Sequence, residues 1–209
     1  MSWTLGLSIG QATESTAMVA VQQVGRTPTC YHLRHVDRFG LGTPYPSTCE
    51  RVGELAASDA LSVPRVVADV TGVGRPVIKM LKGEGLSPHG VWVTGGDSVS
   101  ADGREHRVPK RELASTVQTL LQSGRLRFAE QLPRRSDLVE ELREFRAEID
   151  ISAGKEGFEH WREKDTDDIV LALACALWFS EWKGAPLDPD LIRTAGPRKT
   201  IDKLQDYLS

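Results

Sequence analysis

Residues 4–24 read TLGLSIGQATESTAMVAVQQV, two apolar runs separated by a short polar turn. Runs of this length bounded by turn residues predict strands, and the turn from Gly10 to Ser15 is short enough to join them tightly. A third run, Cys30 to Phe39, nearly alternates apolar and polar side chains, as a half-buried strand does. We therefore expect an antiparallel meander of three strands at residues 4–9, 16–24 and 30–39.

The rest of the chain alternates between helix and strand patterns. Pro44 and Pro46 break the chain before a helix at residues 47–60, for which Ser47 or Thr48 is a plausible cap. Further strands are expected at residues 63–70, 86–93 and 125–128, helices at 76–82, 109–123 and 136–147, and a short extended piece at 148–152. Alternation of strand and helix implies parallel pairing in this half of the sheet.

The last long helix, at residues 167–182, is apolar on nearly every face and should be buried. A meander, then alternating units, then a buried helix with acids at its start is the element order of an RNase H-like fold. Such an α/β fold has a mixed sheet flanked by helices, with the first and fourth strands side by side at its centre. A doubly wound fold would instead need a strand-helix crossover at the start. We expect one domain over residues 1–184 and a tail or docked helix over 185–209.

Composition places the protein among ordinary globular domains, because 40% of its 209 residues are hydrophobic and 26% are charged. No apolar stretch approaches the roughly 18 residues of a membrane span, and the first residues lack the basic start of a signal peptide. We expect an intracellular protein without membrane contact. The three cysteines, Cys30, Cys49 and Cys175, are too far apart for a zinc site or a disulfide framework, and are interpreted as buried thiols.

The net charge of −3 provides no global attraction to nucleic acid, so such binding must come from a local patch. One candidate is the basic run Arg104, His106, Arg107, Lys110 and Arg111, expected in a loop. A solvated loop without function is an equal alternative. Among the histidines, we consider only His106 a candidate functional group.

Acids stand at two places where carboxylates commonly bind Mg²⁺ or Mn²⁺. Asp69 ends the apolar run Val66-Val67-Ala68, where a buried charge needs a compensating partner such as a cation. The alternative is that Asp69 caps the following helix. Asp167 and Asp168 open the last helix, whose dipole favours negative charge, so one of the two is expected to be structural and the other to bind metal.

With these segments placed, the sequence resembles the nuclease domain of the large terminase subunit of tailed phages from about Leu5 to Trp182. Seven stretches carry the resemblance by their order and spacing. They are LGLSIGQ (5–11), FGLGTPYP (39–46), ADVTGVG (68–74), TGGD (94–97), VPKR (108–111), LLQSGRL (120–126) and DDIVLALA (167–174).

The resemblance implies two-metal cleavage of double-stranded DNA with Mg²⁺ or Mn²⁺. Asp69 would be the metal ligand on the central strand, and Asp167 or Asp168 the ligand on the helix. Lys110 falls in the Val-Pro-Lys segment and would contact phosphates together with Arg104, Arg107 and Arg111. The implied setting is the cytoplasm of a bacterial host, for a phage or prophage protein, with an ATPase domain, the small terminase subunit or the portal protein as further partners.

The chain departs from this family at Ser8, where members carry an aspartate on the first strand. A hydroxyl is a poorer Mg²⁺ ligand than a carboxylate, so binding of two ions should be weakened. Glu14 stands where many relatives have a second acid and is a possible auxiliary ligand. No Gly-x-x-x-x-Gly-Lys-Ser/Thr motif of an ATPase occurs in the sequence.

We therefore expect a metal-dependent endonuclease of the terminase type, which cuts concatemeric DNA and is weakened or inactive through Ser8. Ser8 would mark a prophage remnant or a residue introduced to trap an uncut state. The alternative is a catalytically inactive DNA-binding or assembly module with the same fold. A resolvase-like enzyme for branched DNA is a more distant rival.

Overall fold

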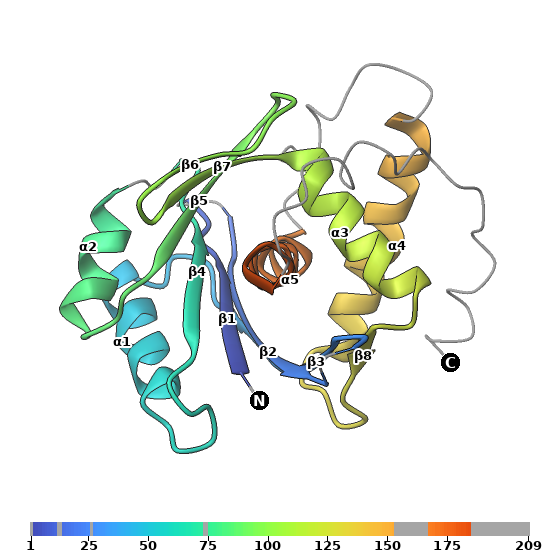
Figure 1. Cartoon of the computed structure of the whole chain (residues 1–209). Helices are drawn as coiled ribbons and strands as arrows, with labels where there is room; N and C mark the ends of the chain where they lie inside the picture. The colour runs from blue at the N-terminus through green and yellow to red at the C-terminus, as the bar shows by residue number, and fades with distance from the viewer. Residues whose placement is uncertain (1, 12–13, 26, 73–74, 153–166, 185–209) are drawn as a thin grey trace.

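The computed structural model describes residues 2–11, 14–25, 27–72, 75–152 and 167–184. Within them, an eight-stranded mixed sheet is flanked by five helices (Figure 1). The strands are β1 (Ser2–Ser8), β2 (Thr16–Val24), β3 (Cys30–Phe39), β4 (Arg65–Asp69), β5 (His89–Thr94), β6 (Ser100–Asp102), β7 (Glu105–Pro109) and β8 (Leu126–Phe128). The helices are α1 (Tyr45–Ala56), α2 (Arg75–Gly83), α3 (Lys110–Gln122), α4 (Arg135–Ser152) and α5 (Asp168–Gly184).

The strands follow the order β6-β7-β5-β4-β1-β2-β3-β8 across the sheet. β1, β2 and β3 form the predicted antiparallel meander. β1, β4, β5 and β7 run parallel to one another as successive neighbours, and β8 adds a parallel strand beside β3. The predicted RNase H-like arrangement, with the first and fourth strands adjacent at the sheet centre, is therefore confirmed.

Helices cover the sheet in layers (Figure 1). α1 and α2 lie on one side, and α5 lies on the other, between the sheet and the outer helices α3 and α4. α5 is buried from Ile169 to Phe179, as expected of a helix that is apolar all round. It packs so closely on β1 that a Cβ atom built on Gly6 would lie 2.1 Å from the carbonyl oxygen of Ala172.

β1 separates two hydrophobic cores because its side chains alternate between the faces of the sheet. Leu5 and Leu7 belong to the core beneath α1 and α2. Thr4 and Gly6 face α5, as shown by the 2.9 Å hydrogen bond between the hydroxyls of Thr4 and Ser180 and by the close approach of Gly6. Ser8, two positions further along, is on the α5 face as well.

Three local predictions were wrong. The helix expected at 47–60 begins at Tyr45 and ends at Ala56. It begins early because proline is well tolerated in the first turn of a helix, which is where Pro46 lies. No side chain caps its start, so neither Ser47 nor Thr48 is the cap. The extended piece expected at residues 148–152 is the end of α4. A helix satisfies its own backbone hydrogen bonds, whereas a lone extended segment needs a neighbouring strand.

The third error concerns the basic run, which we expected in a loop. His106 and Arg107 lie in β7, which pairs with β6 in a hairpin whose turn contains Gly103 in a left-handed conformation (φ 60°), and Lys110 and Arg111 open α3. The dipeptide Asp102-Gly103 is a hairpin signal that predicts this turn.

Of the three cysteines, Cys49 and Cys175 are buried as expected, whereas Cys30 is only half-buried. The tail expected over residues 185–209 lies outside the described residues. Among the described helices, none has the length and apolar character needed to cross a membrane.

Candidate active site

Ser8 and Asp69 are direct neighbours at the carboxyl ends of β1 and β4. They pair in register, and the same row continues to Ala17 on β2 and Arg38 on β3. Asp69 faces α5, because Val67, two positions earlier, belongs to the core beneath that helix. Ser8 is 6% exposed and Asp69 1% exposed. The position of the missing acid is therefore beside the predicted central ligand, on the same face of the sheet.

The direction of α5 brings its acidic start to this row. Thr4 contacts Ser180 near the end of α5, and Gly6 approaches Ala172 and Ala176 further toward its start. α5 thus runs antiparallel to β1, and its first turn lies over the carboxyl ends of β1 and β4. The carbonyl oxygen of Asp167 accepts the first helical hydrogen bond, from the Leu171 N–H at 2.9 Å. The residue before the helix, Asp167, is therefore its N-cap.

Asp69 is held in a local turn. Its Oδ1 accepts hydrogen bonds from the backbone N–H of Thr71 at 2.9 Å and from the Thr71 hydroxyl at 2.6 Å. The Thr71 hydroxyl oxygen in turn accepts the Val93 N–H at 2.8 Å, which connects β4 to β5. Gly72, with φ at 95°, lets the backbone turn sharply directly afterwards. The alternative prediction, that Asp69 caps the following helix, stays a prediction, because these hydrogen bonds go to Thr71, ahead of the start of α2 at Arg75.

Asp168 is held by an ion pair in the interior. Arg38 donates to both of its oxygens, with Nε at 3.0 Å from Oδ2, and also contacts Glu141 on α4. Glu141 accepts the Val170 N–H at 2.9 Å. Burial raises the pKa of Glu141 to about 8; the Val170 N–H opposes this, negative Asp168 adds to it, and Arg38 opposes it. Of the two acids that open α5, Asp168 is thus the one paired with Arg38.

The remaining predicted acid, Glu14, lies in the turn between β1 and β2. Its carboxylate accepts the backbone N–H of Gln11 at 3.1 Å, and its own N–H donates to the Gln11 carbonyl. Glu14 therefore closes its own turn.

Among the described residues, no three or more His, Cys, Asp or Glu side chains are grouped so that they could hold a metal ion. The oxygen donors in the row itself are the carboxylate of Asp69 and the hydroxyl of Ser8, and Asp167 precedes the first residue of α5. Such donors suit one hard cation that keeps water ligands. They do not supply the carboxylates that two ions would need.

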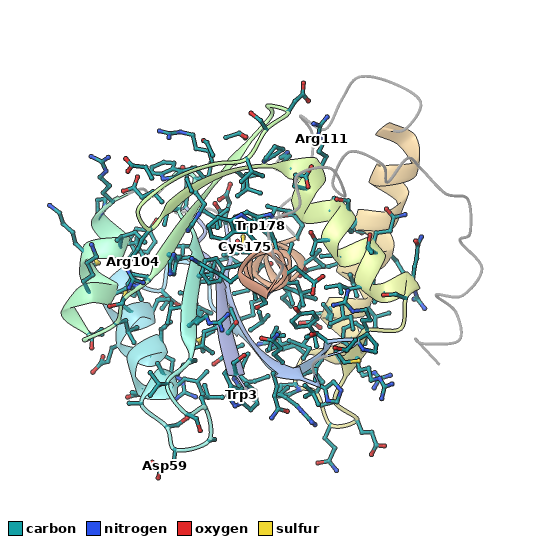
Figure 2. The ribbon with its side chains drawn as sticks, in the orientation of Figure 1. Trp3, Asp59, Arg104, Arg111, Cys175 and Trp178 are labelled. Carbon is teal, nitrogen blue, oxygen red and sulfur yellow. The ribbon has the colours of Figure 1, made fainter. Side chains whose placement is uncertain are left out.

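The predicted DNA-contacting residues do not form one patch. β7 runs parallel to β5 and β4, and by register Asp69 is level with Val91 and His106, so Lys110 and Arg111 lie four and five positions beyond that level, toward the carboxyl ends of the strands. Arg104 precedes β7 and lies at the opposite end of that strand, where it donates to the Ser87 carbonyl. Figure 2 shows Arg104 beside α2 and Arg111 at the start of α3, well apart. Arg107, between them, is exposed.

Arg111 forms an ion pair with Asp97, with 2.7 Å between Nη1 and Oδ1. This contact connects the start of α3 to the loop after β5.

His106 does not lie on a DNA-facing surface, contrary to the prediction of a functional group there. It is 1% exposed, and its ring packs edge-on against Trp178 and Trp182 of α5. Its Nε2 lies 3.0 Å from Nδ1 of His89. His106 is thus part of the aromatic packing between β7 and α5.

Arg38 and Glu141 are site residues that sequence reasoning missed. Strict alternation from Leu33 would turn Asp37 inward and Arg38 outward. A β-bulge changes this, because Leu33 pairs with Val21 and His35 with Ala20, which leaves Arg34 as the extra residue. No sequence signal that we used locates this bulge.

Comparison with solved structures identifies the fold as the RNase H-like fold of large terminase nuclease domains. The human cytomegalovirus terminase nuclease domain matches with a TM-score of 0.55 and 13% identity, over 88% of this chain and 85% of that one. The large terminase nuclease of thermophilic phage G20c matches with a TM-score of 0.50 and 17% identity, over 84% of this chain and 80% of that one. The nuclease domain of the bacteriophage SPP1 large terminase matches with a TM-score of 0.50 and 13% identity, over 86% of this chain and 87% of that one. No protein-family model and no curated protein sequence matches the chain.

Proposed function

We propose that this chain is a DNA endonuclease domain of the large terminase type whose metal centre is weakened by Ser8. The observation that carries the proposal is the register of Ser8 with Asp69 on the face covered by the acidic start of α5. Two of the similar structures were obtained with manganese, one soaked and one bound, which supports a divalent cation.

In this proposal Asp69 and Asp167 hold one divalent ion, with the Ser8 hydroxyl as a neutral third donor. When bound, such an ion supplies Lewis-acid activation of water and of the scissile phosphate. Thr71 fixes the direction of the Asp69 carboxylate through its two hydrogen bonds. Lys110 and Arg111, at the same edge, orient the phosphate backbone of double-stranded DNA. An ATPase domain, the small terminase subunit or the portal protein would be its partners in the cytoplasm of a bacterial host.

A second candidate is a DNA-binding or assembly module that no longer hydrolyses DNA. It is favoured by the ion pair between Arg38 and Asp168, which engages one of the two helix acids. The lack of a three-acid group among the described residues also favours it.

Nicking of supercoiled plasmid with Mn²⁺ separates these candidates. The native chain should nick slowly, and Asp69→Ala should abolish that activity. Ser8→Asp should nick at least about tenfold faster, since it restores a carboxylate ligand for the divalent ion. If the native chain and Ser8→Asp are both inactive, the enzyme proposal is wrong and the binding module replaces it.

The two helix acids provide a matched pair of variants. Asp167→Asn should remove the Mn²⁺-dependent nicking of Ser8→Asp while leaving the fold intact by circular dichroism. Asp168→Asn should lower the free energy of unfolding instead, because it weakens the ion pair with Arg38. The opposite outcome would exchange the roles assigned to these residues.

A further inference from the structure

We propose that Arg38 takes the place of a second divalent ion beside the candidate active site, so that the metal centre holds a single ion. Its guanidinium group supplies to Asp168 the positive charge that another cation would otherwise supply. This inference rests on the proposed function, in which Asp69 and Asp167 hold one ion.

One face of α5 packs directly on β1. The hydroxyls of Thr4 and Ser180 lie 2.9 Å apart, and a Cβ atom on Gly6 would meet Ala172 and Ala176. On the helix these contact residues recur every four positions, and on the strand they recur every two. The lengths match, because four helical residues rise about 6 Å and two strand residues about 7 Å.

The same spacing places Asp168 opposite Ser8. Ser8 is the next contact position of β1 after Gly6, and Asp168 is one helical turn before Ala172. Ser8 also pairs in register with Asp69. Asp168 therefore lies over the position of the missing acid, on the side of the sheet that Asp69 faces.

Arg38 reaches Asp168 from the same row of the sheet. By register, Arg38 follows Ser8 and Ala17 in this row, which puts it two strands, or about 10 Å, from Ser8. Its Nε lies 3.0 Å from Oδ2 of Asp168, and its Nη2 donates to Oδ1. One planar cation thus engages both carboxylate oxygens, which is the strongest form of such a pair.

These contacts leave too few carboxylates for two ions. Two-ion sites hold their ions roughly 3.5–4 Å apart, and each ion needs oxygen ligands of its own. One acid of the row is replaced by Ser8, and Asp168 already has its counter-charge. A second ion at Asp168 would have to displace Arg38, which would then lie beside an ion of like charge with Glu141 as its remaining buried partner.

The alternative is that Arg38 only joins α5 to β3 and α4. The two roles differ in what the loss of the guanidinium group does to metal binding. If Arg38 is only a joining residue, its loss changes stability alone. If Arg38 stands in place of an ion, its loss also changes the number of ions that the site holds.

The first test counts Mn²⁺ ions by calorimetric titration and by electron paramagnetic resonance. Ser8→Asp should bind about one ion per chain, and Ser8→Asp/Arg38→Gln about two, because Asp168 then lacks its cation. Two ions roughly 3.5–4 Å apart couple their spins, which broadens the resonance. A single ion in both variants would overturn the inference.

Two control variants separate this effect from general charge. Ser8→Asp/Arg51→Gln removes the same charge from an exposed pair with Glu54 and should keep about one ion. Ser8→Asp/Arg38→Lys keeps the charge at Asp168 and should also keep about one. Two ions in either control would overturn the inference.

The ion count also separates this inference from the proposed function. Two ions in Ser8→Asp itself would overturn the inference and leave the nuclease proposal standing. No ion in Ser8→Asp would show that the proposed metal centre is wrong, and the inference with it.

The second test uses the native chain, so it does not depend on how well the Arg38 variants fold. Mg²⁺ is added until the NMR signals around Asp69 stop shifting, and the side-chain Nε–Hε signal of Arg38 is followed. This signal should keep its position and its slow exchange with water, because the pair with Asp168 persists. A signal that moves and exchanges rapidly would show that the ion displaces Arg38, which contradicts the inference.

Discussion

Arg38 is the cation that compensates the buried acids at the start of α5. It contacts Asp168 and Glu141, which are 7% and 4% exposed, and it also lies 3.8 Å from Asp137. Carboxylates this deep in a protein are tolerated when a cation and hydrogen bonds compensate them. Arg38 therefore fixes α5 against β3 and α4, and with it the position of Asp167.

Arg38→Met should lower the free energy of unfolding by about 3–5 kcal/mol, because it leaves the buried Asp168 carboxylate without its cation and the buried Glu141 carboxyl group without its hydrogen-bond donor. Urea denaturation measures the loss. Arg51→Met is the matched control, since Arg51 forms an exposed pair with Glu54 and its loss should cost about 0–1 kcal/mol. Equal effects of the two substitutions would contradict the role given to Arg38.

The sequence predicts the positions of some residues of the candidate site and not of others. Asp69 could be predicted because a charge at the end of an apolar run stands out. Arg38 could not, because the bulge at Arg34 reverses the inward and outward positions after it. The ion pair of Asp168 likewise could not be predicted, because its partner Arg38 belongs to a strand distant in sequence.

At the scale of elements, the contact between β1 and α5 positions the site. Gly6 allows it, because a side chain there would meet the carbonyl oxygen of Ala172 and the Cβ of Ala176. A backbone carbonyl cannot swing aside as a flexible side chain can. The helix would have to move away from the sheet as a whole.

Gly6→Ala should therefore destabilise the protein by about 3 kcal/mol, at the upper end of ordinary overpacking. Gly95→Ala is the control, because a Cβ at Gly95 meets no atom within 4 Å. Both values come from urea midpoints. Similar midpoints for the two variants would mean that α5 does not pack on β1 as described.

A second element contact, between β5, β7 and the end of α5, makes stability depend on pH. Burial, followed by Arg104, His106, Lys183 and Arg65, lowers the pKa of His89 from 6.5 to about 4, and burial lowers that of His106. Between these pH values the unfolded chain binds a proton that the folded chain does not, so the free energy of unfolding falls as the pH falls from 6.5 toward 4.

His89→Gln should remove part of this acid sensitivity. The melting temperature of the native chain should drop more between pH 7 and pH 5 than that of His89→Gln. An identical drop in both would assign the acid sensitivity to other groups.

The strands of the meander were predicted within two residues because their apolar runs are long and bounded by turns. The hairpin of β6 and β7 was missed because β6 has only three residues, all exposed, and so lacks an apolar pattern. The last turn of α4 was misassigned because strand and helix patterns cannot be told apart over five residues.

At the scale of the whole molecule, parallel strand pairing places the candidate site residues at one edge of the sheet. β1, β4, β5 and β7 all end there, which brings Ser8, Asp69 and Lys110 to that edge although they are far apart in sequence. The element order predicted this topology. It did not predict that Arg104 and Lys110 lie apart, because they stand at opposite ends of β7, a strand that the sequence analysis did not expect.

Because the net charge is −3, DNA binding must depend on where the cations lie. Lys110→Gln should weaken duplex binding and reduce the slope of log affinity against log salt by about 1. Arg104→Gln, at the opposite end of β7, should leave both unchanged. Anisotropy over a salt series measures this, and an effect of Arg104 as large as that of Lys110 would place the duplex elsewhere.

The most direct measurement is a calorimetric Mn²⁺ titration of the native chain and of Ser8→Asp, with Asp69→Ala in each background. A carboxylate at position 8, beside Asp69, should tighten Mn²⁺ binding by about tenfold or more, and removing Asp69 should abolish binding in both backgrounds. If Ser8→Asp binds Mn²⁺ no more tightly than the native chain, positions 8 and 69 do not share a cation site, and the account is contradicted.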